Sequence, residues 1–174
     1  MNRLSGKVAV ITGGNAGIGE AIAMTFAREG ASVVITGRRQ GELDRVASEI
    51  IKEQGKAYAV AGSVTDESHV QEVTRRTMQQ FGRLDILVNN AGIGDFGKRL
   101  HEIDDATWAQ VLEVNLTGVF RMTRAVLPQM LKQGKGAIVN ISSIASLVGL
   151  PTLPAYAASK GALDALTRTL AIDY

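Results

Sequence analysis

Unbroken apolar runs alternate with amphipathic helical stretches along the chain, and this alternation constrains the fold more than any other feature. The run at residues 8–11 is almost wholly β-branched, and Leu43, Val46 and Ile50 form an apolar stripe at helical spacing. The expected strands are residues 8–11, 32–36, 57–61, 84–88 and 137–141. The expected helices are residues 18–27, 43–51, 70–81, 108–132 and 155–173.

Strands that are apolar throughout and separated by helices are typical of a parallel sheet covered on both faces. The pattern therefore predicts an α/β fold: a Rossmann-type, doubly wound parallel sheet with strand order 3-2-1-4-5. Ligands of such sheets bind at the carboxyl ends of the strands, where the order reverses between the first and the fourth. A length of 174 residues allows one domain with a substantial core, so a single domain over residues 1–174 is expected.

The composition excludes several classes of function. A net charge of +2, from 19 Lys and Arg against 17 Asp and Glu, is too small for a nucleic-acid-binding surface. The absence of cysteine excludes disulfides, thiolate metal sites and cysteine nucleophiles. His69 and His101 are too far apart for a metal-ligand motif, and both are expected at the surface. No apolar run is long enough for a signal peptide or a membrane span, so a cytoplasmic location is expected.

A glycine-rich turn at residues 12–19 connects the first expected strand to the first expected helix. In this context Gly13 allows a tight turn, Gly17 allows a pyrophosphate to approach, and Gly19 allows the helix to pack on the sheet. The N-terminus of a helix also favours a bound phosphate. The turn predicts a dinucleotide site, and the alternative is a plain strand–helix connection.

Tyr156 and Lys160 lie four residues apart on the last expected helix, thirteen residues after Ser143. Since four residues are slightly more than one helical turn, the phenol and the ammonium should point into the same space. A phenol has a pKa of about 10 in water, and a neighbouring cation lowers that pKa toward neutrality. An acid–base pair together with a dinucleotide site indicates an oxidoreductase.

The order and spacing of these motifs, with Asn89-Asn90-Ala91-Gly92 after the fourth strand, resemble the compact single-domain branch of the short-chain dehydrogenase/reductase (SDR) family. The resemblance extends from about Lys7 to the last residue. It implies an NAD(P)-dependent alcohol dehydrogenase or ketoreductase acting on a small-molecule carbonyl or alcohol. One alternative is a non-catalytic dinucleotide-binding fragment. A sugar-nucleotide epimerase or dehydratase is disfavoured, because those relatives have a tighter glycine spacing and a large C-terminal domain.

The resemblance implies a catalytic role for four residues. Tyr156 would be the general acid/base, and Lys160 would bind the hydroxyls of the nicotinamide ribose and lower the pKa of the tyrosine. Ser143 would hydrogen-bond the substrate carbonyl and stabilise developing oxyanion charge. Asn115 would kink its helix and hold a water that links the lysine to solvent.

The resemblance also implies a set of cofactor-binding residues, some of which depart from the family pattern. Gly37 stands where an acidic residue would favour NAD, and Arg38 and Arg39 follow it, so NADP is favoured over NAD with Arg38 as the contact. Ser63-Val64 replaces the usual Asp-Val of the adenine pocket, which weakens that contact. The expected cofactor-binding residues are Gly13, Asn15, Gly17, Ile18, Gly19, Gly37, Arg38, Ser63, Val64, Asn89, Ala91, Gly92, Tyr156 and Lys160.

Family members continue beyond the position of Tyr174 into a sixth strand and a substrate-binding loop. The chain is therefore expected to lack the later strands and to be C-terminally incomplete, with residues 137–141 as an uncovered sheet edge. The resemblance further implies a homo-oligomer, a dimer or tetramer built through the helices at residues 108–132 and 155–173. The segments expected to face the substrate, residues 94–104 and 146–151, do not decide between a hydrophobic ketone, a thioester and a sugar.

Overall fold

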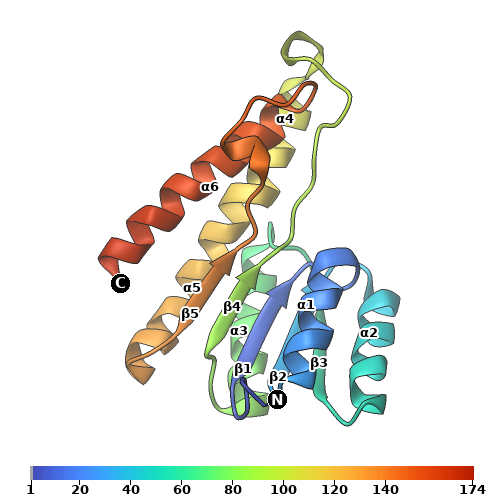
Figure 1. Ribbon diagram of the computed structural model, residues 1–174, viewed down its shortest axis with the longest axis vertical. Coiled ribbons are helices and arrows are strands. Elements are labelled where there is room, and N and C mark those ends of the chain that lie inside the picture. The colour runs from blue at the N-terminus through green and yellow to red at the C-terminus, as the bar shows by residue number, and fades with distance from the viewer. Residues whose placement is uncertain (1) are drawn as a thin grey trace. The chain divides into compact units, whose positions relative to one another are not determined.

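The computed structural model describes residues 2–174 and contains a five-stranded parallel sheet (Figure 1). The observed order, β3-β2-β1-β4-β5, confirms the prediction from the sequence. In the central strand, Val10 pairs with Val34 of β2 on one side and with Leu87 of β4 on the other. The strands are β1 (Val8–Thr12), β2 (Ser32–Gly37), β3 (Lys56–Ala61), β4 (Ile86–Asn89) and β5 (Ala137–Asn140).

The helices also follow the expected order, with one difference. The helix predicted over residues 108–132 is interrupted by a turn of π-helix, η2 (Glu113–Thr117). The α-helices are α1 (Gly17–Arg28), α2 (Gln40–Lys52), α3 (Glu67–Phe81), α4 (Asp105–Leu112), α5 (Gly118–Gln133) and α6 (Pro154–Asp173). Two short 3-10 turns, η1 (Leu100–Glu102) and η3 (Ile144–Ser146), lie in the loops before α4 and α6.

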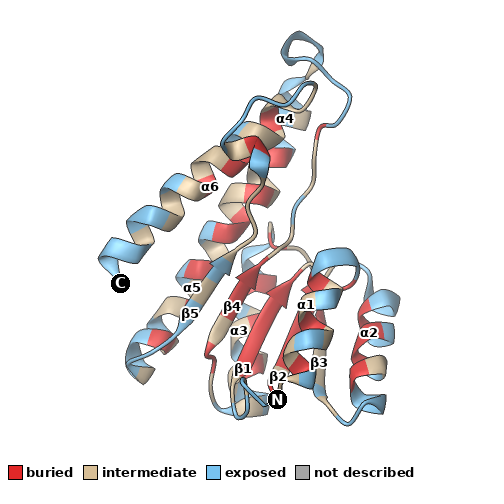
Figure 2. Ribbon diagram, in the orientation of Figure 1, coloured by how far each residue is buried: buried red, intermediate tan, exposed pale blue. Residues whose placement is uncertain are grey.

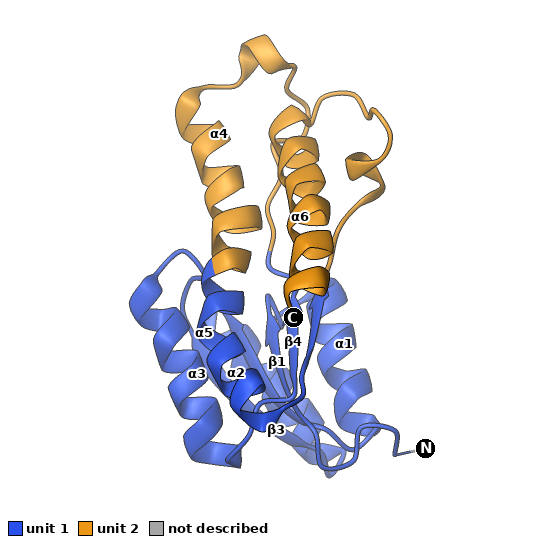
Figure 3. Ribbon diagram, turned by 90° about the vertical axis from the view of Figure 1, so that its left-hand side faces the viewer, with its two compact units in different colours: residues 1–91, 121–139 blue, residues 92–120, 140–174 orange. Residues whose placement is uncertain are grey.

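The chain forms two compact units, each assembled from two segments (Figure 3). The first, here called the sheet unit, contains the chain up to Ala91 together with Arg121–Val139. The second, here called the helical unit, contains Gly92–Phe120 and Asn140–Tyr174. The expected cofactor residues from Gly13 to Ala91 belong to the sheet unit, whereas Gly92 and all four expected catalytic residues belong to the helical unit.

The core of the sheet unit is centred on β1, which is buried along its whole length (Figure 2). Helices α1 and α2 cover one face of the sheet, and α3 covers the other (Figures 1 and 3). Burying one Val, Leu or Ile side chain contributes about 1.5–3 kcal/mol, so the unbroken apolar strands follow from burial on both faces. β5 is an edge strand, and its Val139 is 43% exposed.

The helical unit is built from α4, η2 and α6, which contact one another. Its interior contains Asn115, Ala155, Ser159 and Leu163. Within residues 2–174, no helix combines the length and the apolar character that a membrane span requires. The same residues contain no cluster of three or more side chains that could bind a metal ion.

Candidate cofactor and catalytic residues

Thr12, the last residue of β1, connects the end of this strand to the end of β4. Its Oγ1 donates a hydrogen bond to the Val88 carbonyl (3.4 Å) and accepts from the N–H groups of Asn90 and Ala91 (3.0 Å each). The Asn90 amide in turn donates to the carbonyls of Thr12 (3.0 Å) and Gly13 (3.2 Å). The start of the glycine turn is therefore fixed by contacts to the segment after β4.

The glycines of the turn differ in the space around them. A Cβ on Gly19 would lie 2.3 Å from the Gly13 carbonyl oxygen, so only glycine permits this close approach. Gly17 has φ +56°, and a Cβ placed on it would meet no atom within 4 Å, so the space beside it is open. Ala16 precedes α1 and has no side chain that could cap it. The first N–H groups of α1 therefore remain available to an anion such as a phosphate.

The end of β2 places an arginine against the glycine turn. Asn15 is buried, and with its amide oxygen facing Arg39 that oxygen accepts from Nε (3.1 Å) and Nη2 (2.7 Å) of the guanidinium. A Cβ on Gly37 would lie 2.3 Å from the Asn15 side chain, so the absence of a side chain at Gly37 makes room for Asn15. Arg38, the contact expected from the sequence, and Arg39 are both exposed, and Arg39 is the one that contacts Asn15 in the turn.

At the end of β3, Ser63 makes a local hydrogen bond and Val64 is buried. The Ser63 hydroxyl lies 2.8 Å from Thr65 Oγ1 and accepts from the Thr65 N–H (3.2 Å). His69 was expected at the surface, and that expectation is wrong, because its ring is buried with Nε2 2.7 Å from Thr36 Oγ1. The signal was present in the sequence, since residue 69 lies four residues before Val73 on the buried face of α3.

Strand β4 ends at Asn89, which is buried and donates from its amide to Thr123 Oγ1 (3.3 Å). Ala91 is half-buried and ends the first segment of the sheet unit, and Gly92 is exposed at the start of the helical unit. Asn89 is thus the last residue of β4, and Ala91 and Gly92 lie in the loop after it.

Asn115 lies at the centre of the π-helical turn and is completely buried. Its Oδ1 accepts from the Ile93 N–H (2.9 Å), and its Nδ2 donates to the Ile93 carbonyl (2.9 Å) and to Ser159 Oγ (3.0 Å). Ser159 Oγ donates to the Tyr156 carbonyl (2.7 Å). A π-turn frequently marks a functional position in a helix. Here it directs a polar side chain into the interior, where Asn115 links a loop to α6.

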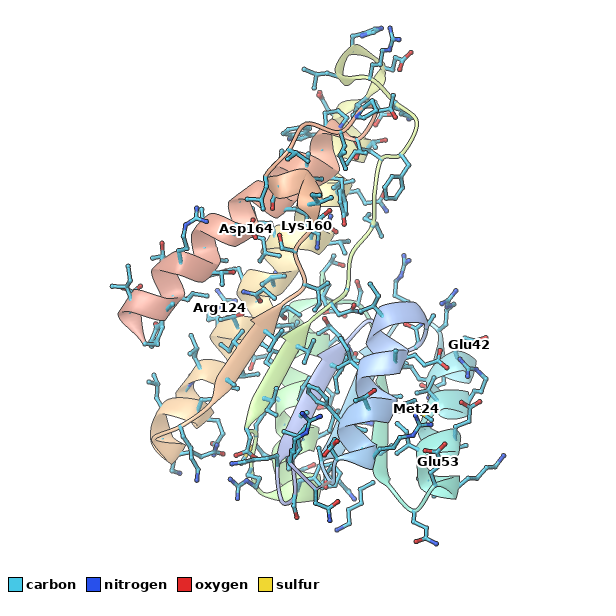
Figure 4. The ribbon with its side chains drawn as sticks, in the orientation of Figure 1. Met24, Glu42, Glu53, Arg124, Lys160 and Asp164 are labelled. Carbon is cyan, nitrogen blue, oxygen red and sulfur yellow. The ribbon has the colours of Figure 1, made fainter. Side chains whose placement is uncertain are left out.

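Tyr156 and Lys160 lie on α6, about one turn apart. The Lys160 Nζ is 5.6 Å from the centre of the Tyr156 ring and donates to the Ile141 carbonyl (2.6 Å). Lys160 is 4% exposed, so burial lowers its pKa, and the negative charge of Asp164 acts in the opposite direction. Both Lys160 and Asp164 project from α6 (Figure 4). The arrangement can hold a cation beside a phenol.

Ser143 follows β5 and caps the short turn η3. Its Oγ accepts a hydrogen bond from the Ala145 N–H (3.2 Å). This bond uses a lone pair of the oxygen and leaves the hydroxyl hydrogen available. The hydroxyl can therefore donate to a substrate oxygen.

Asp95 is a candidate that sequence reasoning missed. It is 5% exposed and accepts hydrogen bonds from the N–H groups of Ala155 and Tyr156, both at 3.0 Å. Its neighbour Phe96 has its ring centre 5.6 Å from that of Tyr156. Leu153, the residue that precedes α6, has an apolar side chain that cannot cap the helix. In the sequence, this was the indication that the first N–H groups of α6 need an acceptor from another segment.

Comparisons with known proteins find similarity to the short chain dehydrogenases. A family model described as short chain dehydrogenase matches residues 7–174. The 2-(S)-hydroxypropyl-CoM dehydrogenase 3 of Xanthobacter autotrophicus is 44% identical over 173 residues, which cover 99% of this chain and 68% of that protein.

Solved structures give the same result. A short chain dehydrogenase/reductase from Burkholderia phymatum in complex with NAD superposes with a TM-score of 0.95 at 36% identity, covering 100% of this chain and 62% of that one. A metagenomic short-chain oxidoreductase in complex with NADP superposes with a TM-score of 0.94 at 38% identity, covering 98% and 77% respectively. The chain thus spans roughly two thirds of the length of the Xanthobacter autotrophicus dehydrogenase.

Proposed function

The chain belongs to the short chain dehydrogenase family, and from that premise we propose that it binds NAD(P) and interconverts a carbonyl compound and an alcohol. The observation that supports the proposal best is the pairing on α6, where the Lys160 ammonium lies 5.6 Å from the Tyr156 ring. A cation at this position stabilises negative charge on the phenol oxygen, as an acid–base catalyst requires.

The residues of the helical unit would act on the oxygen of the substrate. A bound dinucleotide would supply or accept the hydride at C4 of its nicotinamide. Tyr156 donates a proton to the carbonyl oxygen during reduction and accepts one from the hydroxyl during oxidation. Ser143 donates a hydrogen bond to the same oxygen and stabilises its developing charge. Asn115 fixes the first turns of α6 through Ser159.

The residues of the sheet unit fit a dinucleotide. The open space beside Gly17 and the uncapped N-terminus of α1 suit a pyrophosphate. We infer a preference for NADP over NAD, because Gly37 offers no carboxylate and the guanidinium of Arg39 lies beside the turn. Arg38 remains a second candidate for the 2′-phosphate. Exchange of each arginine for alanine distinguishes the two, since the selecting residue should weaken NADPH binding and leave NADH binding unchanged.

We also infer a cytoplasmic homo-oligomer, a dimer or tetramer assembled through α4, α5 and α6. Exposed apolar side chains on these helices, Trp108, Leu131 and Ile172, favour such contacts. Light scattering on the purified chain tests the oligomer, and a monomeric mass at micromolar concentration would contradict it.

The first experiment is a fluorescence titration of NADPH, with NADH in parallel, into the 174-residue chain. Saturable binding is expected, followed by turnover in a screen of ketones, β-ketoacyl thioesters and oxidised sugars. Tyr156→Phe should abolish turnover and leave the dissociation constant of the dinucleotide within about twofold, because the phenol acts in the proton step. Substantial turnover by Tyr156→Phe would contradict the assignment. Binding without any turnover by the unmodified chain would favour a dinucleotide-binding module.

A further inference from the structure

The first turn of α6 depends on a distant carboxylate. Helix α6 begins at Pro154, so the N–H groups of Ala155 and Tyr156 are among those that have no partner within the helix. Both groups donate to Asp95, which lies 60 residues earlier in the chain. The Ala155 N–H donates to one oxygen of the carboxylate and the Tyr156 N–H donates to the other, each at 3.0 Å.

The residues around Asp95 contact the same part of the helical unit. We call residues 93–97 the strap. Ile93 exchanges two backbone hydrogen bonds with the Asn115 amide, and the Phe96 ring lies 5.6 Å from the ring of Tyr156. The strap therefore makes contacts on both sides of Asp95 in the sequence, with Asn115 through Ile93 and with Tyr156 through Phe96.

The strap also holds a strained residue just before α6. Thr152 has φ +60°, which a β-branched residue rarely adopts, and its carbonyl accepts from the Gly97 N–H (2.9 Å). Such a conformation costs on the order of 1–3 kcal/mol and persists only where the surroundings impose it. Strain of this kind is concentrated at functional sites, and here it adjoins the helix that bears Tyr156.

Capping a helix with a buried carboxylate costs free energy, because the carboxylate loses its hydration. Asp95 is 5% exposed, and a serine or aspartate at position 153 would satisfy the same N–H groups near solvent. The two charge-assisted hydrogen bonds and the positive end of the helix offset this cost. The carboxylate also does what a local cap does not, because it ties the backbone of Tyr156 to the strap.

We propose that Asp95 is a positioning residue for Tyr156, fixing the first turn of α6 and thereby the direction in which the phenol points. The consequence for turnover rests on the proposed function, whereas the consequence for the order of Tyr156 does not. Because each carboxylate oxygen accepts one N–H, asparagine retains one acceptor and alanine retains none. The effects are therefore graded, with Asp95→Asn between the native chain and Asp95→Ala.

The first test observes the tyrosine directly, by NMR of the chain labelled with ¹³C at the ring carbon that bears the hydroxyl. The chain has three tyrosines, Tyr58, Tyr156 and Tyr174, and Tyr156→Phe assigns the signal of interest. In Asp95→Ala that signal should shift and broaden while the other two stay in place. Asp95→Asn should show a smaller change of the same kind. An unchanged Tyr156 signal in the folded Asp95→Ala variant would overturn the proposal.

Asp66 provides a matched control, since its carboxylate caps α3 by accepting from the N–H groups of Ser68 (2.9 Å) and His69 (3.4 Å). Asp66→Ala should lower the melting temperature through the loss of this cap and leave the Tyr156 signal unchanged. A shift of that signal in Asp66→Ala as large as in Asp95→Ala would show a general loss of stability and refute a positioning role.

The second test measures turnover once a substrate is in hand. Asp95→Ala should lower kcat about 10- to 100-fold, the range for a catalytic group displaced by up to ~1 Å, and leave the dinucleotide dissociation constant within about twofold. A kcat equal to that of the native chain would overturn the proposal. If Asp95→Ala does not fold, Asp95→Asn decides, and a native Tyr156 signal in that variant refutes the idea. A chain that binds no dinucleotide refutes the proposed function, and the NMR result still decides the role of Asp95.

Discussion

Replacing Asn115 with alanine should destabilise the protein strongly, although the substitution removes only one small polar side chain. The side chain makes three hydrogen bonds in a site with no exposed surface, two to the backbone of Ile93 and one to Ser159. Alanine leaves the N–H and the carbonyl of Ile93 without these partners. A buried polar group that loses its partner costs about 1–3 kcal/mol. We therefore expect the free energy of unfolding to fall by about 2–5 kcal/mol, out of the ~5–15 kcal/mol that is typical of a domain.

The assay is urea unfolding followed by circular dichroism at neutral pH. Gln71→Ala is the control, because Gln71 is exposed on α3 and bonds only the Glu67 side chain (3.0 Å), so a change within about 0.5 kcal/mol is expected. A loss below ~1 kcal/mol for Asn115→Ala would refute the reasoning, since it would mean that water satisfies the Ile93 groups at little cost.

Asn115→Asp sharpens the same test, because it preserves the shape of the side chain. The aspartate can accept from the Ile93 N–H, but its second oxygen then faces the Ile93 carbonyl at the position where Nδ2 donates at 2.9 Å. We expect Asn115→Asp to be less stable than the native chain above neutral pH. The deficit should shrink on mild acidification, because a protonated carboxyl can donate to the carbonyl. Equal stability at both pH values would contradict the contact geometry.

Three further predictions concern other residues. Burial lowers the pKa of His69, so the unfolded chain takes up a proton near pH 6.5 while the folded chain does not. The free energy of unfolding, measured with urea, should therefore be highest above that pH and decline below it. His69→Gln should remove this part of the pH dependence. Burial alone would raise the pKa of Asp85, but hydrogen bonds from Arg83 and a backbone N–H outweigh it and the net shift is downward. This stabilisation is present above the unfolded-state pKa of about 3.9 and lost as the pH falls through the lower folded-state value, and Asp85→Asn should flatten that acid limb. Gly37→Asp should displace Asn15 and shift the cofactor preference toward NADH; unchanged relative affinities for NADPH and NADH in a fluorescence titration would contradict it.

The sequence predicted the sheet well because the signals that specify it are local. Each strand is a short apolar run, and the glycines at positions 13 and 19 lie where neighbouring atoms leave no room for a side chain. The π-turn within the predicted helix 108–132 was not foreseen as such, although the resemblance implied a kink at Asn115. A buried asparagine on an apolar stripe was the visible sign, and its partner Ile93 lies 22 residues away.

The contacts around Tyr156 were predicted only in part, and distance along the chain explains what was missed. Tyr156 and Lys160 were found because they share one helix and one face. Asp95 was missed because its partners are backbone N–H groups, which leave no pattern in the side chains 60 residues later. Arg38 and Arg39 are adjacent, and the sequence alone does not tell which of them turns toward Asn15.

The position of β1 at the centre of the sheet has a consequence for synthesis of the chain. Its neighbour β2 follows after a single helix, but its pairing with β4 begins with Ala9 and Ile86, which lie 77 residues apart. Contacts between segments so far apart slow folding, because a long loop must close before they form. During synthesis, the edge of β1 that pairs with β4 therefore stays unpaired until more than half of the sheet unit has been made. An unpaired apolar edge favours aggregation, so substitutions that delay pairing with β4 should reduce the yield of soluble protein more than they reduce its stability once folded.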